Sequence, residues 1–215
     1  YTTARDLAKL ACGALKNEDF RTVVSTRKRN ISFKNGEGIR LLVNHNRMLR
    51  SYDGSIGVKT GYTKKCGRCL VSAAERDGMR LVAVTLNAPD DWRDHTAMLD
   101  WGFKSYVRLD LTGKGTFKVS LPVCGGSQDS LTCSNSLPLE VTLPAGHGDI
   151  SCTVEASRFL IAPVEAGAQV GRLIYRCGGE VIATSPLCAE TGASVYKKPN
   201  FFIRWLMALF GREYQ

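Results

Sequence analysis

The most constraining feature of this chain is a pair of apolar runs joined by a two-residue turn. The runs are CLVSAAER and MRLVAVTLNA, and Asp77-Gly78 stands between them. The tight turn that best matches the twist of two antiparallel strands needs positive φ at both central residues, which Asp-Gly supplies readily. The sequence therefore predicts an antiparallel hairpin with strands at roughly 67–76 and 79–88.

A third strand is predicted over roughly 56–62, and it carries Lys59-Thr60-Gly61. These residues offer an ammonium group, a hydroxyl group and a backbone without Cβ, which another chain can approach closely. At a sheet edge, such a strand suits a carboxylate-bearing peptide that adds as a further strand. A bare K-T-G tripeptide also occurs by chance at solvated strand ends, so its context must decide between the two interpretations.

Helices are expected around this sheet. Apolar residues at helical spacing predict a helix over 3–16 and a second, short one near 18–26. Pro89-Asp90-Asp91 has the chemistry of a helix start, and the helix that follows should cover one face of the sheet. We expect the other face to lack a partner within this chain, and residues 31–58 to form loops and short strands.

The second part of the chain has a different amino-acid composition. Residues 107–196 are rich in Val, Leu and Thr, with Gly at regular intervals, and predict six to eight short strands of an all-β module. No catalytic constellation appears there, so a stalk or a partner-binding role is the expectation.

Residues 197–215 predict an amphipathic helix with one broad apolar arc. About ten helical residues reach about 15 Å, which is half of a bilayer's hydrocarbon core, so this helix can lie in the membrane interface but cannot span it. The alternative is a helix packed onto its own protein. The residues predicted to enter the membrane surface are Phe201, Phe202, Trp205, Leu206, Leu209 and Phe210.

Charge is unevenly distributed along the chain. Residues 1–104 hold 19 Lys and Arg against 11 Asp and Glu, a net charge of +8, whereas residues 105–196 hold 6 against 8. The basic residues of the first part are scattered, without a zinc-finger, helix-turn-helix or stacking-aromatic pattern. This distribution favours attraction to an anionic cell surface or wall polymer over nucleic acid binding.

The sequence predicts neither a metal site nor a cofactor. Cys66 and Cys69 have metal-ligand spacing, but no second C-x-x-C follows, and His45, His95 and His147 are dispersed. Five of the eight cysteines lie in the predicted β module. This odd number leaves at least one free or paired elsewhere, and their connectivity stays open.

A nucleophile of the Ser-Lys type is not evident. The single S-x-x-K run that precedes K-T-G joins Ser25 to Lys28 and lies among Arg21, Arg27 and Arg29. A catalytic pair of this type needs a desolvated lysine, which a charged and solvated face does not provide. We interpret Ser25 as part of a surface helix end.

The context of K-T-G resembles one enzyme family. Serine penicillin-recognising enzymes carry S-x-x-K, then S-x-N or Y-x-N, then K-T-G. The segment 44–103, with GVKTGYT, GRCLVSAAERDGMRLVAVTLNAPDDWRDH and MLDWGF, is similar to the D-alanyl-D-alanine carboxypeptidases, the low-molecular-mass penicillin-binding proteins of peptidase family S11. YTTARDLAKLA resembles their helix after the S-x-N loop, and 163–173 resembles part of their C-terminal β domain. The tail resembles their amphipathic anchor.

The resemblance implies an α/β fold. Residues 1–106 would form the C-terminal half of a catalytic domain with the antiparallel sheet and flanking helices of serine β-lactamases and DD-peptidases. Residues 107–196 would form an all-β domain, and 197–215 an amphipathic membrane-anchor helix. The S-x-x-K and S-x-N motifs would lie in a missing N-terminal part, so this chain alone is expected to be inactive.

The resemblance also implies removal of the terminal D-alanine from peptidoglycan stem peptides, and β-lactam binding by the complete enzyme. Lys59 and Thr60 would hold the ligand carboxylate, Gly61 would admit the ligand backbone, and the Tyr62 N–H would form half of the oxyanion hole. Arg93, or alternatively Arg68, would add a second cation. The expected location is the extracytoplasmic face of the cell membrane, as a peripheral protein.

One alternative of a different class remains. A non-catalytic, wall-associated binding protein could retain the carboxylate-binding strand without a nucleophile. The DNA immediately upstream of Tyr1 separates the two hypotheses, because the enzyme requires S-x-x-K and S-x-N to be encoded there.

Overall fold

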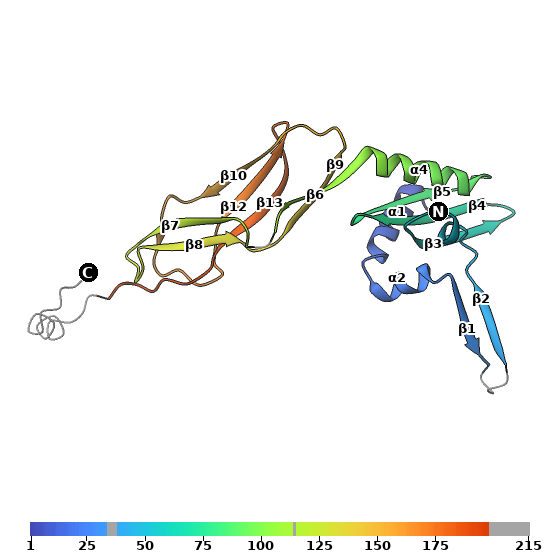
Figure 1. Cartoon of the computed structure of the whole chain (residues 1–215), viewed down its shortest axis with the longest axis horizontal. Helices are drawn as coiled ribbons and strands as arrows, with labels where there is room; N and C mark the ends of the chain where they lie inside the picture. Colours follow the sequence, from blue (N-terminus) through green and yellow to red (C-terminus); the bar gives the residue numbers. More distant parts are fainter. Residues whose placement is uncertain (34–37, 114, 198–215) are drawn as a thin grey trace, which may run out of the picture. The chain divides into compact units, whose positions relative to one another are not determined.

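The computed structural model describes residues 1–33, 38–113 and 115–197 (Figure 1). The chain divides into two compact units. The first comprises residues 1–108 together with 142–146, and the second takes 109–141 and the described residues from 147 onward. The predicted membrane-anchor helix lies outside the described residues, apart from Lys197. Within the described ranges, none of the helices combines the length and hydrophobicity needed to cross a lipid bilayer.

The first unit is built around an antiparallel sheet with the strand order β3-β4-β5. Its elements are α1 (Ala4–Ala14), α2 (Glu18–Ser25), β1 (Lys28–Ser32), β2 (Ile39–Val43), α3 (Met48–Ser51), β3 (Ser55–Thr63), β4 (Gly67–Arg76), β5 (Met79–Thr85) and α4 (Asp91–Ser105). The predicted hairpin is confirmed, since Asp77 and Gly78 have φ of 48° and 73° between β4 and β5.

Local side-chain chemistry fixes the helix starts. The Thr3 hydroxyl accepts a hydrogen bond from the Asp6 N–H at 3.1 Å and caps α1. The Asn17 side chain accepts from the Phe20 N–H at 2.8 Å and caps α2 in the same way. The helix predicted after Pro89 is also present. Its cap residue Asp90, however, makes no side-chain cap hydrogen bond, and the carboxylate of Asp91 bonds the Trp92 N–H instead.

Helices lie on both faces of the sheet. On one face Met48 of α3 and Leu99 of α4 pack with Leu70, and on the other Leu15, at the end of α1, packs with Val58 and Ala73. The expectation that one face lacks a partner within the chain was therefore wrong: α1 and α2 occupy it. Their cover is partial, because Leu10 of α1 remains 67% exposed.

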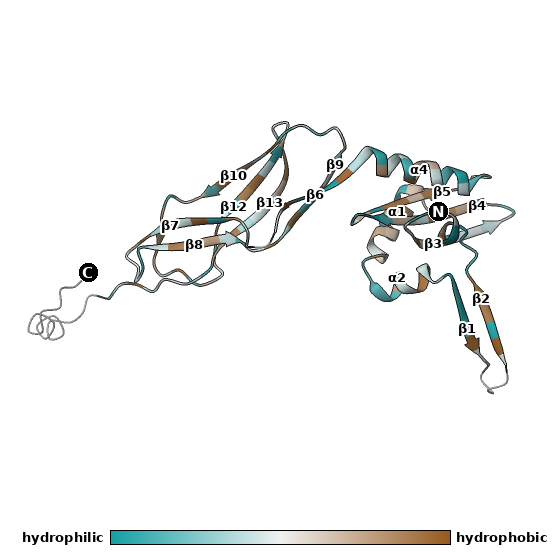
Figure 2. Cartoon of the chain, viewed as in Figure 1, coloured by the Kyte–Doolittle hydropathy of each residue, from teal (hydrophilic) through white to brown (hydrophobic). Residues whose placement is uncertain are grey.

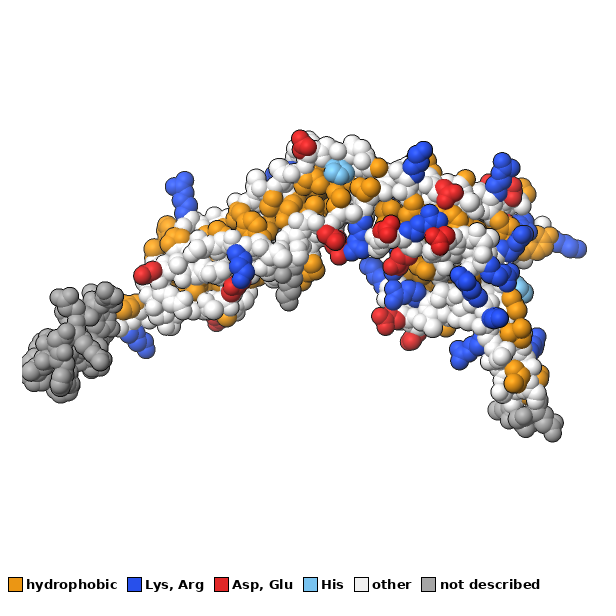
Figure 3. Space-filling model, viewed as in Figure 1, with side chains coloured by type: hydrophobic (Ala, Val, Ile, Leu, Met, Phe, Trp, Pro, Cys, Tyr) orange, Lys and Arg blue, Asp and Glu red, His pale blue; other side chains and the backbone are white. Residues whose placement is uncertain are grey.

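Strands β1 and β2 form a separate antiparallel hairpin before α3, in the region where short strands were expected. All of their described residues are exposed. Figure 3 shows Lys and Arg side chains over much of the visible surface of the first unit, as the charge distribution of the sequence predicts.

The second unit is an all-β structure, and hydrophobic positions recur along its strands (Figure 2). One sheet has the strand order β10-β12-β13-β8-β7-β11, and β6 pairs with β9. Leu131, Leu173 and Leu187 are almost fully buried. From residue 106 onward the strands are β6 (Tyr106–Thr112), β7 (Lys118–Cys124), β8 (Ser130–Asn135), β9 (Leu139–Pro144), β10 (Ile150–Ala156), β11 (Leu160–Ile161), β12 (Gln169–Cys177) and β13 (Glu180–Ala189). The first residues of β6 and the last of β9 belong to the first unit.

Candidate ligand-binding edge of the sheet

The K-T-G sequence lies on β3, which is an edge strand of its sheet. Gly61 stands opposite Cys69 of β4, and Tyr62 stands opposite Arg68. Lys59 and Gly61 are exposed, Thr60 is half-buried, and the Tyr62 side chain is 72% exposed. The sequence therefore places these four residues together at a solvent-accessible sheet margin.

The hydrogen-bonding register decides which backbone groups face that margin. In an antiparallel strand, the N–H and C=O of one residue point to the same side, and the side alternates along the strand. The Glu75 N–H donates to Gly54, just before β3, whereas the Arg68 carbonyl accepts from Ala88, on the β5 side. The backbone groups of odd-numbered β4 residues therefore hydrogen-bond β3, and Cys69 pairs with Gly61 in this way. The backbone groups of the flanking residues Thr60 and Tyr62 then point away from β4, to the open side of β3.

The side chain of Lys59 lies beside a groove. Its ammonium group donates to the carbonyl of Thr60. Among the described residues, no carboxylate lies within ion-pair distance of it. The groove, of about 430 Å³, is lined mainly by apolar side chains of α1, α2 and the strands, with Leu7, Leu10, Phe20 and Val71 among them. The Lys59 charge is thus exposed and available to an anion at the edge of the sheet.

Ser25 and Lys28 are on different elements. Ser25 is the last residue of α2, where its hydroxyl donates to the Thr22 carbonyl at 3.3 Å. Lys28 is the first residue of β1 and is exposed. The run therefore lacks the buried helix start that a Ser-Lys nucleophile requires.

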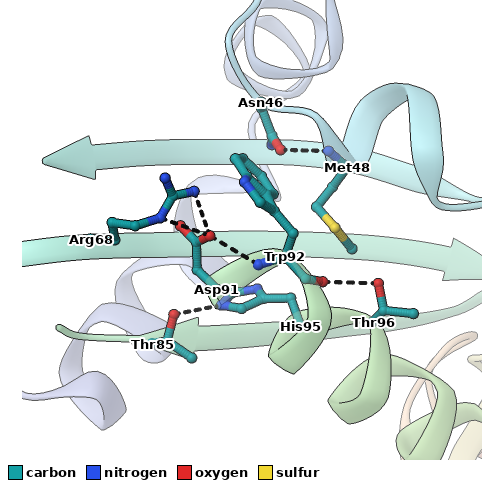
Figure 4. Close-up of polar contacts among 8 residues, drawn as sticks. All are labelled: Asn46, Met48, Arg68, Thr85, Asp91, Trp92, His95 and Thr96. Atoms are coloured by element: carbon teal, nitrogen blue, oxygen red, sulfur yellow. Dashed lines mark hydrogen bonds and ion pairs between the residues drawn. The ribbon is translucent and has the colours of Figure 1, made fainter. Parts of the chain in front are cut away.

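Of the two arginines considered as a second cation, Arg68 lies opposite Tyr62 and Arg93 does not. The Arg68 Nε and Nη2 donate to Asp91 Oδ1 at 3.1 and 2.7 Å (Figure 4). This hydrogen bond raises the pKa of Arg68. The guanidinium also lies 5.8 Å from the ring centre of Trp92, whose other neighbour, Arg47, lies at 6.0 Å. Arg93 is exposed on α4.

Behind the strands, His95 links the sheet to α4. Its Nδ1 lies 2.5 Å from the Ser72 hydroxyl of β4, and its Nε2 lies 3.0 Å from the Thr85 hydroxyl at the end of β5. The imidazole is fully buried. Burial penalises the charged form and lowers the pKa of His95 to about 4, so the ring is neutral at neutral pH.

The cysteines give no sign of a metal site. Cys66 lies in the turn between β3 and β4, and the Cys69 thiol donates to the Cys66 carbonyl at 3.6 Å. All eight cysteines are free thiols in the structure. In the part of the chain that the structure describes, no three His, Cys, Asp or Glu side chains gather as a metal ion would require.

Sequence reasoning named Lys59, Thr60, Gly61 and Tyr62 but missed Asp91 and His95 as residues that support this edge. Asp91 was interpreted only as part of a helix start, and His95 only as one of three dispersed histidines. A usable signal was present. In an amphipathic helix that covers a sheet, residues four apart share a face, so Asp91, His95 and Leu99 belong to the buried face of α4.

Solved structures with a similar fold, and protein families with a similar sequence, were both found for this chain. Penicillin binding protein 5 from Haemophilus influenzae has the same fold, with a TM-score of 0.70 at 23% identity over 90% of this chain and 57% of that one. A structure of PBP3 from Streptococcus pneumoniae, a peptidoglycan synthesis regulatory factor, gives 0.65 at 21% identity, with the same coverage. The K-T-G edge strand, the helices on both sheet faces and the β unit thus define a transpeptidase-like fold of the penicillin-binding proteins.

The sequence places the chain within one family of that class. Residues 1–90 match the D-alanyl-D-alanine carboxypeptidases of peptidase family S11, and residues 107–192 match the C-terminal domain of penicillin-binding protein 5. The chain belongs to the S11 family of D-alanyl-D-alanine carboxypeptidases, as its sequence motifs predict.

Two curated relatives illustrate the extent of the match. The D-alanyl-D-alanine carboxypeptidase DacF of Bacillus subtilis is 30% identical over 88% of this chain and 50% of its own length. DacA of Escherichia coli, another D-alanyl-D-alanine carboxypeptidase, is 28% identical over 87% of this chain and 47% of its own length. The chain thus spans about half the length of these relatives.

Proposed function

We propose that this chain forms the carboxylate-binding side of a serine-type D-alanyl-D-alanine carboxypeptidase that trims peptidoglycan stem peptides. The observation that carries the proposal is the open side of β3, where the backbone groups of Thr60 and Tyr62 face away from β4 beside the exposed Lys59. A stem peptide ending in D-alanine would add there as an extended strand. The substrate is a wall component, so the proposed location is extracytoplasmic.

Each residue has a distinct proposed task. The Lys59 ammonium and the Thr60 hydroxyl bind the terminal carboxylate through charge-assisted hydrogen bonds. The Tyr62 N–H donates to the oxygen of the penultimate carbonyl as it becomes an oxyanion. We assign no residue of this chain as the attacking serine, because Ser25 and Lys28 lie on different elements. A β-lactam, which also carries a carboxylate beside a reactive carbonyl, would occupy the same edge.

Removing the Lys59 charge should weaken ligand binding. Lys59→Met should raise the Kd for diacetyl-Lys-D-Ala-D-Ala by at least about tenfold, since a hydrogen bond to a charged group contributes about 1.5–3 kcal/mol. Ligand-induced amide shifts in heteronuclear NMR spectra of the chain measure this. Lys64→Met is the matched control, because Lys64 is an exposed lysine in the turn that follows β3. Equal effects of the two substitutions would contradict the assignment.

Gly61→Val tests the need for a bare backbone. A Cβ at residue 61 would meet the Cys69 Cβ at 3.7 Å, an ordinary contact, so the variant should fold. Its side chain would occupy space that an incoming peptide needs, and the Kd should rise by about tenfold or more. Gly13→Ala, on α1 with no atom within 4 Å of the added Cβ, should bind like the parent chain. Unchanged affinity of Gly61→Val would place the ligand elsewhere.

We also propose that residues 197–215 attach the protein peripherally to the membrane. The support is the sequence alone: a broad apolar arc that includes Trp205, with basic residues at Lys197, Lys198, Arg204 and Arg212. Apolar side chains would enter the interface while the cations meet anionic headgroups.

A further inference from the structure

Three hydrogen bonds converge on one oxygen of Asp91 at the start of α4. Arg68 donates two of them, from Nε and Nη2, and the Trp92 N–H donates the third at 3.0 Å (Figure 4). Asp91 is only 3% exposed. A carboxylate held this way has little rotational freedom, so Asp91 fixes the guanidinium of Arg68 relative to α4.

Arg68 lies next to the end of β3 that is proposed to bind the ligand. It is the second residue of β4, directly opposite Tyr62. Its own carbonyl accepts a hydrogen bond from the Ala88 N–H at 2.9 Å, which ties the start of β4 to the segment leading into α4. Among the residues that the structure describes, β3 pairs only with β4, so the placement of Gly61 and Tyr62 depends on where the start of β4 is held.

We propose that Asp91 and Arg68 act as a positioning pair that sets the ligand-binding end of β3. Neither residue needs to touch the ligand. The pair anchors the start of β4 to α4, and the Gly61–Cys69 backbone pairing carries that constraint to the Tyr62 N–H. This inference rests on the proposed function for its effect on binding, but its effect on the strand is independent of that function.

A second ion pair on the same sheet, whose carboxylate is more exposed (37% against 4%), provides a control for the position of the pair. Arg80 Nε and Nη2 donate to one oxygen of Glu75 at 2.9 and 2.7 Å, nearly the geometry of the Arg68–Asp91 pair. This pair links β4 and β5 beside the Asp77-Gly78 turn, at the opposite end of β4. A general contribution of ion pairs to sheet stability would spread the effect of losing either pair across the sheet, whereas positioning confines it to the end of β4 where each pair lies.

Amide hydrogen exchange of the chain separates these outcomes without any ligand. Asp91→Asn keeps an oxygen that can accept from Trp92 but removes the charge that strengthens the Arg68 hydrogen bonds. In this variant the Gly61 and Cys69 amides should exchange about tenfold faster than in the parent. Amides near the Asp77-Gly78 turn should keep their rates. Glu75→Gln should show the reverse pattern. Arg68→Lys, which retains the charge but not the two-point contact, should reproduce the Asp91→Asn pattern.

Ligand titrations then connect the strand to the function. Asp91→Asn should raise the Kd for diacetyl-Lys-D-Ala-D-Ala by about tenfold, and Glu75→Gln by less than about twofold. Uniform acceleration of exchange across the sheet in Asp91→Asn, or none at Gly61 and Cys69, would overturn the positioning role. Absence of saturable binding by the parent chain would instead overturn the proposed function, and the exchange result would still decide the inference.

Discussion

Lowering the pH from 7.5 to 4.5 should remove roughly 2–3 kcal/mol from the free energy of unfolding of the first unit through His95 alone. In the folded protein the pKa of this buried imidazole is about 4, against an ordinary value of 6.5. The unfolded chain therefore binds a proton that the folded chain excludes. The contribution is complete above pH 6.5 and is lost progressively as the pH falls towards 4.

Urea titrations at several pH values test this expectation. Tryptophan fluorescence is a suitable signal for the first unit, because Trp92 and Trp101 lie on α4. His95→Gln removes the titrating group while its amide can still bond Ser72 and Thr85. The difference in stability between parent and variant should therefore shrink by roughly 2–3 kcal/mol between pH 7.5 and 4.5. His45→Gln, an exposed histidine, is the control. A pH-independent difference for His95→Gln would contradict the burial argument.

Leu99→Ala should destabilise the first unit by about 2–5 kcal/mol. Leu99 is 1% exposed on α4 and packs with Leu70 and Ala83 of the sheet, so truncation removes buried methyl groups and leaves a cavity. The neighbouring Met98→Ala is the matched control on the same helix, because Met98 is 39% exposed. Its cost should stay below about 1 kcal/mol.

The same urea titrations at pH 7.5 measure both substitutions. The Leu99 cost exceeds that of a lost hydrophobic contact, because the surrounding sheet can relax only partly into the space. Equal midpoints for Leu99→Ala and Met98→Ala would show that α4 does not close the core on this face of the sheet.

The fold of the first unit was predictable where local chemistry and hydrophobic pattern agreed. Asp77-Gly78 has only a few favourable backbone conformations and stands between two apolar runs, so the hairpin followed directly. The packing of α1 and α2 on the second face of the sheet was not predictable. It depends on the turn between the two helices, which brings Leu15 and Phe20 against the sheet. Helical spacing predicts that a helix has an apolar face but not which surface that face meets.

The candidate site was also predictable only in part. Lys59, Thr60, Gly61 and Tyr62 are consecutive, so one motif identifies them all. The Arg68–Asp91 contact spans 23 residues and joins a strand to a helix, and neither residue type at that separation predicts an ion pair. Arg93 and Arg68 were equivalent in sequence, and only the register of β4 against β3 distinguishes them.

The open side of β3 also exposes the protein to its own copies. Unpaired backbone groups on a sheet margin are a template for any extended chain, including a partly unfolded neighbour. If this margin admits a peptide, as we propose, it cannot be shielded by a helix or by a closed barrel. Lys59, Lys64 and Lys65, on this strand and its turn, place positive charges along it. All three charges repel a second copy, and under the proposed function the Lys59 charge also attracts the ligand, so one lysine would serve both recognition and colloidal stability.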